Sequence, residues 1–491
     1  MKKGILLWFI MIALIVSGCS QPQPVHVDNS LPVDNEKENL AHDNEGSTPG
    51  DIEEDVNASD LEEDEELTEM AEEEHKTEED TLVPQEEVEE EIQEGIEDPV
   101  EPQEPEEPQE PTQPQEPAKP QGEYPVVKEF NTQLPEDINL DIKYDRYHTS
   151  YDYFLVLGAN INVREKPTTG SKVVRKAGVY EKLNLVQAVK GQHLNRYNSD
   201  TWYKVFWKNK DKVEYGYAFG ALGQPRSFQF DKMKESITAL KKEVDNNSTA
   251  YVSNYKNRNG IAPLYNGAVE DKYGIKRYQA APAYTEAKTS SEFRYISDGT
   301  LVTILDKNDK FYKIRTLNFE GEYWVPRKFI TSWHSIKELT KVVVVDRKNQ
   351  NEGVFEYRDG KWNLISYIFA TTGEKAEYKE ETSLGYYMAI QTRDRFLYLD
   401  DETREISGYA PYAIRFNGGA YIHGVPVNFE IKVEGEGEEE KKEMIDPGIK
   451  EYLYTIGTVP RSHKCVRNYS SHAKFLYDWV EIGKSAVIVI E

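Results

Sequence analysis

The sequence predicts a mainly β protein that follows a long disordered N-terminal segment, and three observations favour this fold class. Between residues 155 and 222, short apolar runs alternate with turn residues, as they do in small β-barrels. Farther along, Asp359-Gly360 separates two apolar runs, and Asp-Gly between strands is the strongest short signal for a hairpin. Residues 20–123 contain few aromatic residues and many Glu, Pro and Gln, a composition that cannot bury a hydrophobic core.

Residues 1–18 are typical of a secretory signal. Lys2 and Lys3 precede an unbroken apolar run over 5–16, which is shorter than the ~20 residues that a membrane span requires. The run leads to Val16-Ser17-Gly18-Cys19, which resembles a bacterial lipobox. This resemblance implies a lipoprotein whose signal peptide is 1–18 and whose Cys19 carries the lipid. We therefore expect the protein to be lipid-anchored at the outer face of the bacterial cytoplasmic membrane and to reach into the cell wall. The alternative is an ordinary cleaved signal with a chance cysteine.

Residues 19–123, the tether, hold the acidity of the chain. Residues 1–124 carry 5 Lys against 38 Asp plus Glu, a net charge of −33, whereas the whole chain has −29 and the remainder therefore +4. About 105 residues span on the order of 350 Å when fully extended and roughly 60 Å as a random coil. The carboxylates could bind metals or partners, but we expect a disordered, self-repelling spacer.

The folded part is expected to begin at Tyr124. A first SH3-type domain is predicted at 124–226, because Ile161-Asn162-Val163-Arg164 and the later Trp202-Tyr203-Lys204-Val205 resemble strands of bacterial SH3-type domains. A second, weaker copy is predicted at 271–333. Related domains bind cell-wall peptides or act as spacers, and the sequence leaves both functions open.

A helical connector is predicted between these two domains, at 227–270. Its apolar residues recur at helical spacing and favour packing rather than a site: Met233, Ile237, Leu240 and Val244. The last domain is predicted at 338–491, where Lys341 opens an apolar strand-like run and 486–490 reads as a buried strand. A helix is predicted before that strand, because Ser470 and Ser471 are good N-cap residues and apolar residues then recur at helical spacing: Ala473, Leu476, Tyr477 and Val480.

Cys465 is the only thiol besides Cys19. His463, Lys464 and Arg467 surround it, and because cations lower a thiol pKa and the thiolate is the nucleophile, we expect an activated thiol. The alternative is a buried, inert cysteine. A second imidazole, His423, lies on a stretch with strand-like alternation. These residues alone would also fit a cysteine peptidase, and a metal site of His423, His463 and Cys465 is a further, disfavoured alternative.

This order of motifs resembles the YkuD-type L,D-transpeptidase catalytic domain over roughly 338–491. The family signature is His-Gly followed by Ser/Thr-His-Gly-Cys-apolar-Arg/Asn, and it stands here as His423-Gly424 and residues 462–467. Thr382-Ser383-Leu384-Gly385-Tyr386-Tyr387 occupies the place of a further family motif. The resemblance implies two small SH3-type β-barrels followed by a β-sandwich-like L,D-transpeptidase domain with the cysteine at its cleft.

The resemblance also implies the chemistry, which is acyl transfer on peptidoglycan stem peptides to give 3-3 cross-links. Cys465 would be the nucleophile and His423 the general base, with the Gly424 carbonyl orienting the imidazole. The oxyanion and substrate would be met by Ser462, His463, Lys464 and Arg467, with the backbone N–H groups of Lys464 and Cys465 facing the oxyanion and Arg467 a carboxylate. We expect a monomer that binds stem peptides and, through its lipid, the membrane, and that uses no metal, cofactor or nucleic acid.

Two departures from the family pattern bear on activity. Residues 433–443 form a charged insertion, which we expect to be a surface loop. Lys464 replaces the glycine before the cysteine. Either this position has a positive φ, which costs a lysine ~1–2 kcal/mol, or φ is ordinary and the ammonium lowers the thiol pKa. We expect the second. The alternative function is a catalytically impaired, cell-wall-binding lipoprotein.

Overall fold

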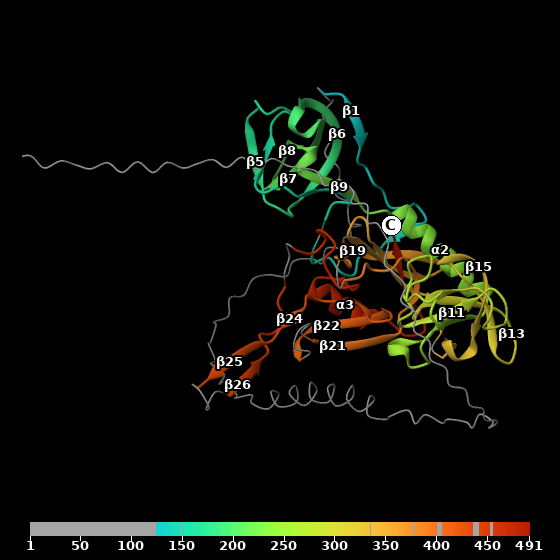
Figure 1. Ribbon diagram of the computed structural model, residues 1–491. Coiled ribbons are helices and arrows are strands. Elements are labelled where there is room, and N and C mark those ends of the chain that lie inside the picture. The colour runs from blue at the N-terminus through green and yellow to red at the C-terminus, as the bar shows by residue number, and fades with distance from the viewer. Residues whose placement is uncertain are drawn as a thin grey trace, which may run out of the picture. The chain divides into compact units, whose positions relative to one another are not determined.

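The computed structural model describes residues 124–491 apart from 148, 334, 377–378, 400–404, 436–440 and 452–454 (Figure 1). The predicted signal peptide, the lipidated Cys19 and the tether therefore lie outside the described residues. Within them the protein is mainly β, with two α-helices, and forms two small β units and a two-sheet domain. No helix among the described residues is long and apolar enough to cross a membrane.

The first β unit is one sheet whose long central strands follow from alternating apolar residues. Its strands are β1 (Val126–Glu129), β3 (Asp152–Val156), β4 (Ile161–Arg164), β5 (Val173–Ala177), β6 (Lys182–Leu194), β7 (Ser199–Asn209), β8 (Lys212–Phe219) and β9 (Gly223–Ser227). The order is β5-β4-β8-β7-β6-β3-β9, with β1 paired to β6. Two 3-10 turns, η1 (Asn195–Tyr197) and η2 (Gly220–Leu222), connect strands.

The second β unit is a seven-stranded sheet. Its strands are β10 (Thr249–Val252), β11 (Ala280–Tyr284), β12 (Phe293–Ser297), β13 (Leu301–Lys307), β14 (Phe311–Thr316), β15 (Phe319–Pro326) and β16 (Ile330–Thr331), with 3-10 turns η3 (Tyr255–Asn257) and η4 (Arg327–Phe329). The order is β12-β11-β15-β14-β13-β10-β16. The SH3-type identity of both units stays a prediction.

The C-terminal domain is built from two sheets. The six-stranded sheet has the order β2-β19-β18-β17-β28-β20 and contains β2 (Ile138–Leu140), β17 (Lys341–Asp346), β18 (Asn351–Arg358), β19 (Lys361–Phe369), β20 (Gly385–Met388) and β28 (Ser485–Ile490). The five-stranded sheet has the order β21-β22-β23-β27, with β24 on β22, and contains β21 (Gln391–Leu399), β22 (Ile406–Asn417), β23 (Ala420–His423), β24 (Val427–Asn428) and β27 (Val466–Arg467).

The run Val342–Val345 is continuously apolar because both faces of the six-stranded sheet are buried. Val343 and Val345 face the second sheet, where they share a core with Ile422 and Val466. Val342 and Val344 face the other way, into the core that contains α2 (Phe230–Asn246). The domain is therefore layered, with helix α2, the six-stranded sheet and the five-stranded sheet in succession.

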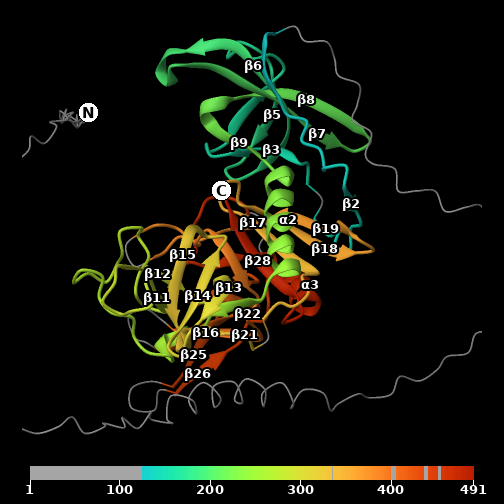
Figure 2. The same cartoon turned by 90° about the vertical axis from the view of Figure 1, so that its right-hand side faces the viewer.

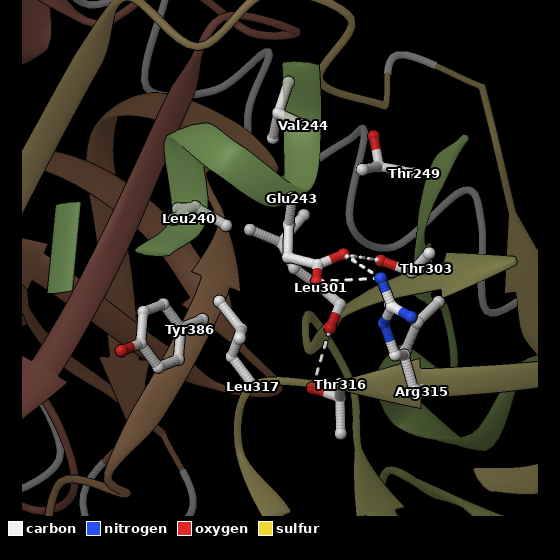
Figure 3. Close-up of a pocket in the computed structure, with 11 residues that line it drawn as sticks. Leu240, Glu243, Val244, Thr249, Leu301, Thr303, Arg315, Thr316, Leu317 and Tyr386 are labelled. Carbon is white, nitrogen blue, oxygen red and sulfur yellow. Dashed lines mark hydrogen bonds and ion pairs between the residues drawn. The ribbon is translucent and has the colours of Figure 1, made fainter. Parts of the chain in front are cut away.

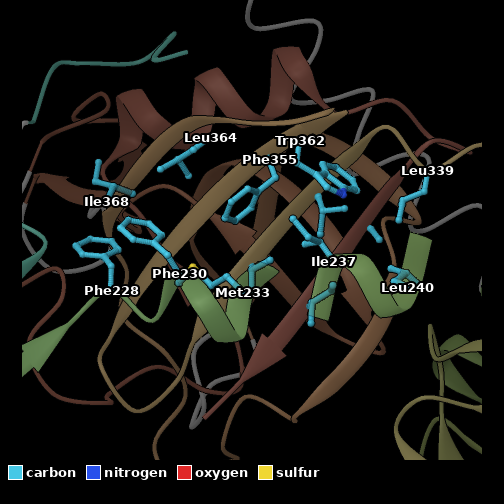
Figure 4. Close-up of a cluster of buried hydrophobic side chains, with 14 of the residues drawn as sticks. Phe228, Phe230, Met233, Ile237, Leu240, Leu339, Phe355, Trp362, Leu364 and Ile368 are labelled. Atoms are coloured by element: carbon cyan, nitrogen blue, oxygen red, sulfur yellow. The ribbon is translucent and has the colours of Figure 1, made fainter. Parts of the chain in front are cut away.

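Helix α2 covers the outer face of the six-stranded sheet (Figure 2). The predicted helical stripe is correct, and all four of its residues are buried. Figure 4 shows Phe230, Met233 and Ile237 beside Phe355 and Trp362 of the sheet. The helix is thus part of the C-terminal domain's core rather than a free connector.

Several local predictions are confirmed. Asp359 and Gly360, both at positive φ, form the turn of the β18–β19 hairpin, and β28 is a buried strand that pairs with β17. Helix α3 (Ser470–Trp479) forms where helical spacing predicts it, but its N-terminal N–H groups bind the Glu451 carboxylate instead of a serine cap. The described residues of the charged insertion belong to an exposed hairpin, β25 (Glu430–Glu434) and β26 (Lys441–Ile445), rather than a loop.

The predicted domain boundaries need two corrections. Strand β2 lies within the predicted first SH3-type domain, but it pairs in parallel with β19 at the edge of the six-stranded sheet. The second β unit begins with β10 at Thr249, inside the predicted connector. Both strands pair with partners distant in sequence, and no local pattern specifies such pairing.

Candidate active site

The site forms where β27 meets β23. The two strands are parallel, with Ile422 opposite Val466 and His423 opposite Arg467. Ile422 and Val466 face the core between the sheets, so strand alternation directs their neighbours to the opposite face. Cys465 packs on that face against Tyr421. The fold therefore brings His423, Cys465 and Arg467 to one face of two adjacent strand segments, although 42 positions separate His423 from Cys465.

The Cys465 thiol is buried, with 8% of the residue exposed, and its Sγ contacts the Gly419 carbonyl oxygen at 3.9 Å. Burial raises the pKa of this thiol, and a hydrogen bond from the Tyr421 backbone and the charges of Arg467 and Lys464 oppose that rise. The sequence-based expectation of a lowered pKa is therefore wrong in direction, because desolvation of the thiolate outweighs the nearby cations.

His423 is buried and carries a defined tautomer. Its Nδ1 lies 2.6 Å from the Gly424 carbonyl oxygen, which can only accept a hydrogen bond, so Nδ1 bears the proton and Nε2 is left as a base. Burial lowers the pKa of His423 to about 4, and the Arg467 charge acts in the same direction. Thiol and imidazole are therefore both neutral at neutral pH. The contact implied for Gly424 is present, while the catalytic roles of these residues stay predictions.

Gly424 fits where a larger residue would not. A Cβ at this position would lie 2.9 Å from Pro411 Cγ and 3.0 Å from Ser470 Cα. The Gly424 N–H also donates to the Pro411 carbonyl oxygen at 2.8 Å. The close approach of β22 and α3 thus fixes the backbone segment whose carbonyl holds His423.

The loop before Cys465 is held by buried side chains. The Ser462 hydroxyl, 1% exposed, donates to the Cys465 carbonyl oxygen at 2.5 Å, and the Thr382 hydroxyl donates to the Lys464 carbonyl oxygen at 2.9 Å. Ser462 therefore supports the loop. The His463 side chain is exposed.

Lys464 has φ of +71°, in the left-handed region that favours glycine. The expectation of an ordinary angle is therefore wrong. The Lys464 N–H donates to the Glu380 carbonyl oxygen at 2.8 Å, so in this structure it is not available to an oxyanion. Of the two predicted oxyanion donors, the N–H groups of Lys464 and Cys465, only that of Cys465 therefore remains a candidate. The ammonium lies 3.4 Å from the Glu380 carboxylate and is among the charges that favour the thiolate.

Arg467 lacks a carboxylate partner among the described residues, and its buried Nε has no hydrogen-bond partner there. Its pKa is lowered, first by burial and also by the nearby Arg461. Arg461 is likewise without a described carboxylate, its Nε is buried and unpaired, and its Nη2 lies 3.4 Å from the Tyr180 hydroxyl of the first β unit. Two guanidinium groups that have no carboxylate partner in the described part of the chain thus lie close to each other near the thiol. Sequence reasoning assigned no role to Arg461, although it precedes Cys465 by only four residues, and it could not find Tyr180, which only tertiary contact brings to Arg461.

A metal-binding cluster is not formed by His, Cys, Asp or Glu side chains within the described part of the chain. The site as built can perform nucleophilic chemistry with a thiol and a neutral imidazole base.

Residues 340–489 match the family model YkuD, the L,D-transpeptidase catalytic domain. The match covers less than a third of the 491 residues and supports an L,D-transpeptidase catalytic domain in that part of the chain. A comparison with curated protein sequences finds no match.

Solved structures similar to the chain are distant. They include a fused Zn-dependent amidase/peptidase/peptidoglycan-binding protein from Clostridium acetobutylicum (16% identity, TM-score 0.20, 31% of this chain and 52% of that chain). Others are L,D-transpeptidases from Mycobacterium smegmatis (15%, 0.23, 43% and 99%) and, as L,D-transpeptidase 3, from Mycobacterium tuberculosis (17%, 0.24, 40% and 93%). The chain spans about half the length of the first of these. These TM-scores do not bear on the fold, and the L,D-transpeptidase catalytic domain is supported by the family match over residues 340–489.

Proposed function

We propose that this protein is a peptidoglycan L,D-transpeptidase that joins the third residues of two stem peptides. The observation that carries the proposal is the placement of His423, on β23, and Cys465, directly before β27, on one face of the sheet. The His423 tautomer is fixed by Gly424, and the site lies inside a segment that matches the family model. The resemblance to the family supplies the substrate class.

The reaction proceeds in two acyl transfers. Cys465 Sγ attacks the carbonyl carbon of the third stem residue while His423 Nε2 takes the thiol proton. The tetrahedral intermediate collapses, the bond to the terminal D-alanine breaks, and His423 returns the proton to its amine. The side-chain amine of a second stem then attacks the thioester, and its proton passes through His423 to the departing thiolate. No oxidant, metal or cofactor enters this balance.

The neutral state of the pair sets the pH dependence. Because the pKa of His423 is lowered to about 4, the base form persists well below neutral pH, and protonation of this imidazole removes activity only as pH falls through about 4. Because burial raises the pKa of Cys465, the thiol is protonated at neutral pH and must lose its proton during attack. The cluster of Arg461 and Arg467 suits the carboxylates that a stem peptide carries.

Location forms the second half of the proposal. The lipobox-like sequence at Cys19 and the apolar run before it support lipid anchoring at the outer face of the membrane, and the acidic tether would let the folded part reach the wall. Replacing Cys19 with alanine should release the protein from a membrane fraction, and retention there would count against the anchor.

A covalent adduct tests the chemistry. In the chain carrying Cys19→Ala, Cys465 is the one remaining thiol. Exposure to a carbapenem should add one adduct to the intact mass, and adding Cys465→Ala should abolish it. A mixture of stem tetrapeptides should then yield a 3-3 linked dimer. Release of free tripeptide alone would indicate a hydrolase of the cysteine peptidase kind.

One observation favours a second function. Lys464 combines a positive φ with an N–H that is already bonded to Glu380. If this geometry disables the oxyanion site, the protein is a catalytically impaired wall-binding lipoprotein. In that case the carbapenem leaves the mass unchanged while the protein still sediments with purified peptidoglycan.

A further inference from the structure

The second β unit touches the C-terminal domain at the turn that faces the candidate nucleophile. Gly299 packs so closely on β22 that a Cβ there would lie 1.9 Å from the Phe416 carbonyl oxygen, and its φ of +82° also requires glycine. The Gly299 carbonyl oxygen accepts the Met388 N–H at 2.9 Å, and Thr300 forms a bridge with Tyr387. The contact is therefore made backbone to backbone.

Asp298, 1% exposed, is the polar centre of this contact. Its Oδ2 accepts from Arg415 Nη1 at 2.7 Å and from the Gly418 N–H at 3.1 Å, and its Oδ1 accepts from the Asn254 N–H at 2.6 Å. Arg415 also donates to the Gly418 carbonyl oxygen at 3.3 Å, and its guanidinium lies 4.4 Å from the Tyr255 ring centre. A buried carboxylate of one unit thus fixes an arginine and a turn of the other.

The turn fixed in this way is the wall beside Cys465. Gly418 and Gly419 join β22 to β23, and Gly419 supplies the carbonyl oxygen that Sγ contacts at 3.9 Å. Arg415 pairs across the sheet with Tyr421, which lies one residue before the Ile422–Val466 pair and packs against Cys465. A continuous row of contacts therefore runs from Asp298 to the thiol.

A second link reaches the residue next to the thiol. Lys276 of the second β unit lies 2.6 Å from Glu380 Oε1, and Lys464 lies 3.4 Å from Glu380 Oε2. The backbone of Glu380 accepts the Lys464 N–H. The same unit thus contacts the surroundings of Cys465 at two places, through Asp298 at the Gly418 N–H and through Lys276 at Glu380.

We infer that the second β unit is a structural component of the active site, and that Asp298 is a positioning residue which holds the Gly418–Gly419 turn against Cys465. Removing this unit should therefore impair the chemistry. Neither predicted function of the unit, binding of cell-wall peptides or spacing, anticipates this effect. The inference rests on the proposed function for its meaning in catalysis, but the placement of the thiol can be measured without it.

The test compares two contacts of the same unit in the full chain carrying Cys19→Ala. Asp298→Ala removes the contact beside the thiol. Arg315→Ala removes a contact away from it, where Arg315 Nη2 lies 3.0 Å from Glu243 Oε1 of α2 (Figure 3). Each variant is assayed for the rate of carbapenem acylation, the rate of Cys465 alkylation by iodoacetamide from pH 6 to 10, and the midpoint of thermal unfolding.

We expect Asp298→Ala to slow acylation at least about tenfold and to speed alkylation several-fold at every pH, because a released turn exposes the thiol while misplacing it. Arg315→Ala should lower the unfolding midpoint but change both rates less than about twofold. Asp298→Asn keeps the shape and loses the charge that faces Arg415, so it should produce smaller changes of the same sign even if Asp298→Ala fails to fold.

The inference would be overturned if the rates of acylation and alkylation were equal in the Asp298 variants and in Arg315→Ala. It would also be overturned if the rate changes in the Asp298 variants were fully explained by the fraction of protein that is unfolded. If the unsubstituted chain forms no carbapenem adduct, the proposed function fails, but the alkylation series still decides whether the second β unit positions the thiol.

Discussion

The backbone at Lys464 offers a sharp test, because the structure assigns it a cost. A non-glycine residue in the left-handed region loses roughly 1–2 kcal/mol. Lys464→Gly removes this cost and also the contact with Glu380, a partly exposed ion pair worth about 0.2–1 kcal/mol. The free energy of unfolding should therefore rise by on the order of 1 kcal/mol, which corresponds to about 2–4 °C if the C-terminal domain unfolds in one transition.

Lys464→Ala is the matched control. It loses the same ion pair but keeps a Cβ and hence the left-handed strain, so the glycine variant should be more stable than the alanine variant by ~1 kcal/mol. Denaturant titration monitored by tryptophan fluorescence measures this difference. Equal stability of the two variants would refute the assignment of strain to this residue.

The same variants separate charge from backbone geometry at the thiol. Both remove an ammonium that favours the thiolate, so Cys465 alkylation should move to higher pH by the same amount in each. Carbapenem acylation that is faster in the glycine variant than in the alanine variant would mean that the strained lysine impairs the enzyme. Acylation that is equal in both would mean that the positive φ is tolerated.

Two further predictions concern buried positions in the C-terminal domain, Glu352 and Gly424. Burial raises the pKa of Glu352 to about 8, above the value of this carboxyl in the unfolded chain. The folded state therefore holds its proton more tightly, and the free energy of unfolding falls as pH rises from about 4.5 to 8. Glu352→Gln should remove this pH-dependent loss of stability. Unfolding free energies of both proteins at pH 5, 6.5 and 8 should therefore diverge in favour of the variant, and parallel values would contradict the argument. Gly424→Ala should keep the fold but reduce carbapenem acylation about tenfold or more, because the added Cβ collides with Pro411 and Ser470 and displaces the carbonyl that orients His423. Acylation at the original rate would show that this carbonyl is not needed.

Much of the local structure could be predicted because its signals lie within a few residues of one another. The alternating and helical spacings of apolar side chains locate strands and α2, since they depend only on the geometry of the element. Asp359-Gly360 specifies a tight turn because both residues tolerate positive φ. The same local rule fails at Ser470 and Ser471, where the side chain of Glu451 takes over the capping role.

The candidate site divides in the same way. The groups proposed to react, Cys465 and His423, could be named from the sequence because a thiol or an imidazole is a property of the residue. The sign of the thiol pKa shift could not, because burial depends on Tyr421 and other residues that the fold brings over Cys465. The φ of Lys464 was missed for a similar reason, since the Glu380 backbone helps to hold that angle.

The sequence by itself determined the mainly β class of elements and the chemical groups that the proposed reaction uses, because these depend on residue identity and short-range periodicity. Only the tertiary structure decided that β2 and α2 belong to the C-terminal domain, that Arg461 reaches Tyr180, and that Asp298 reaches the turn beside Cys465. Each of these depends on contacts between residues far apart in the chain, and the free energy that selects them comes from burial and pairing across the whole core, which no local pattern encodes.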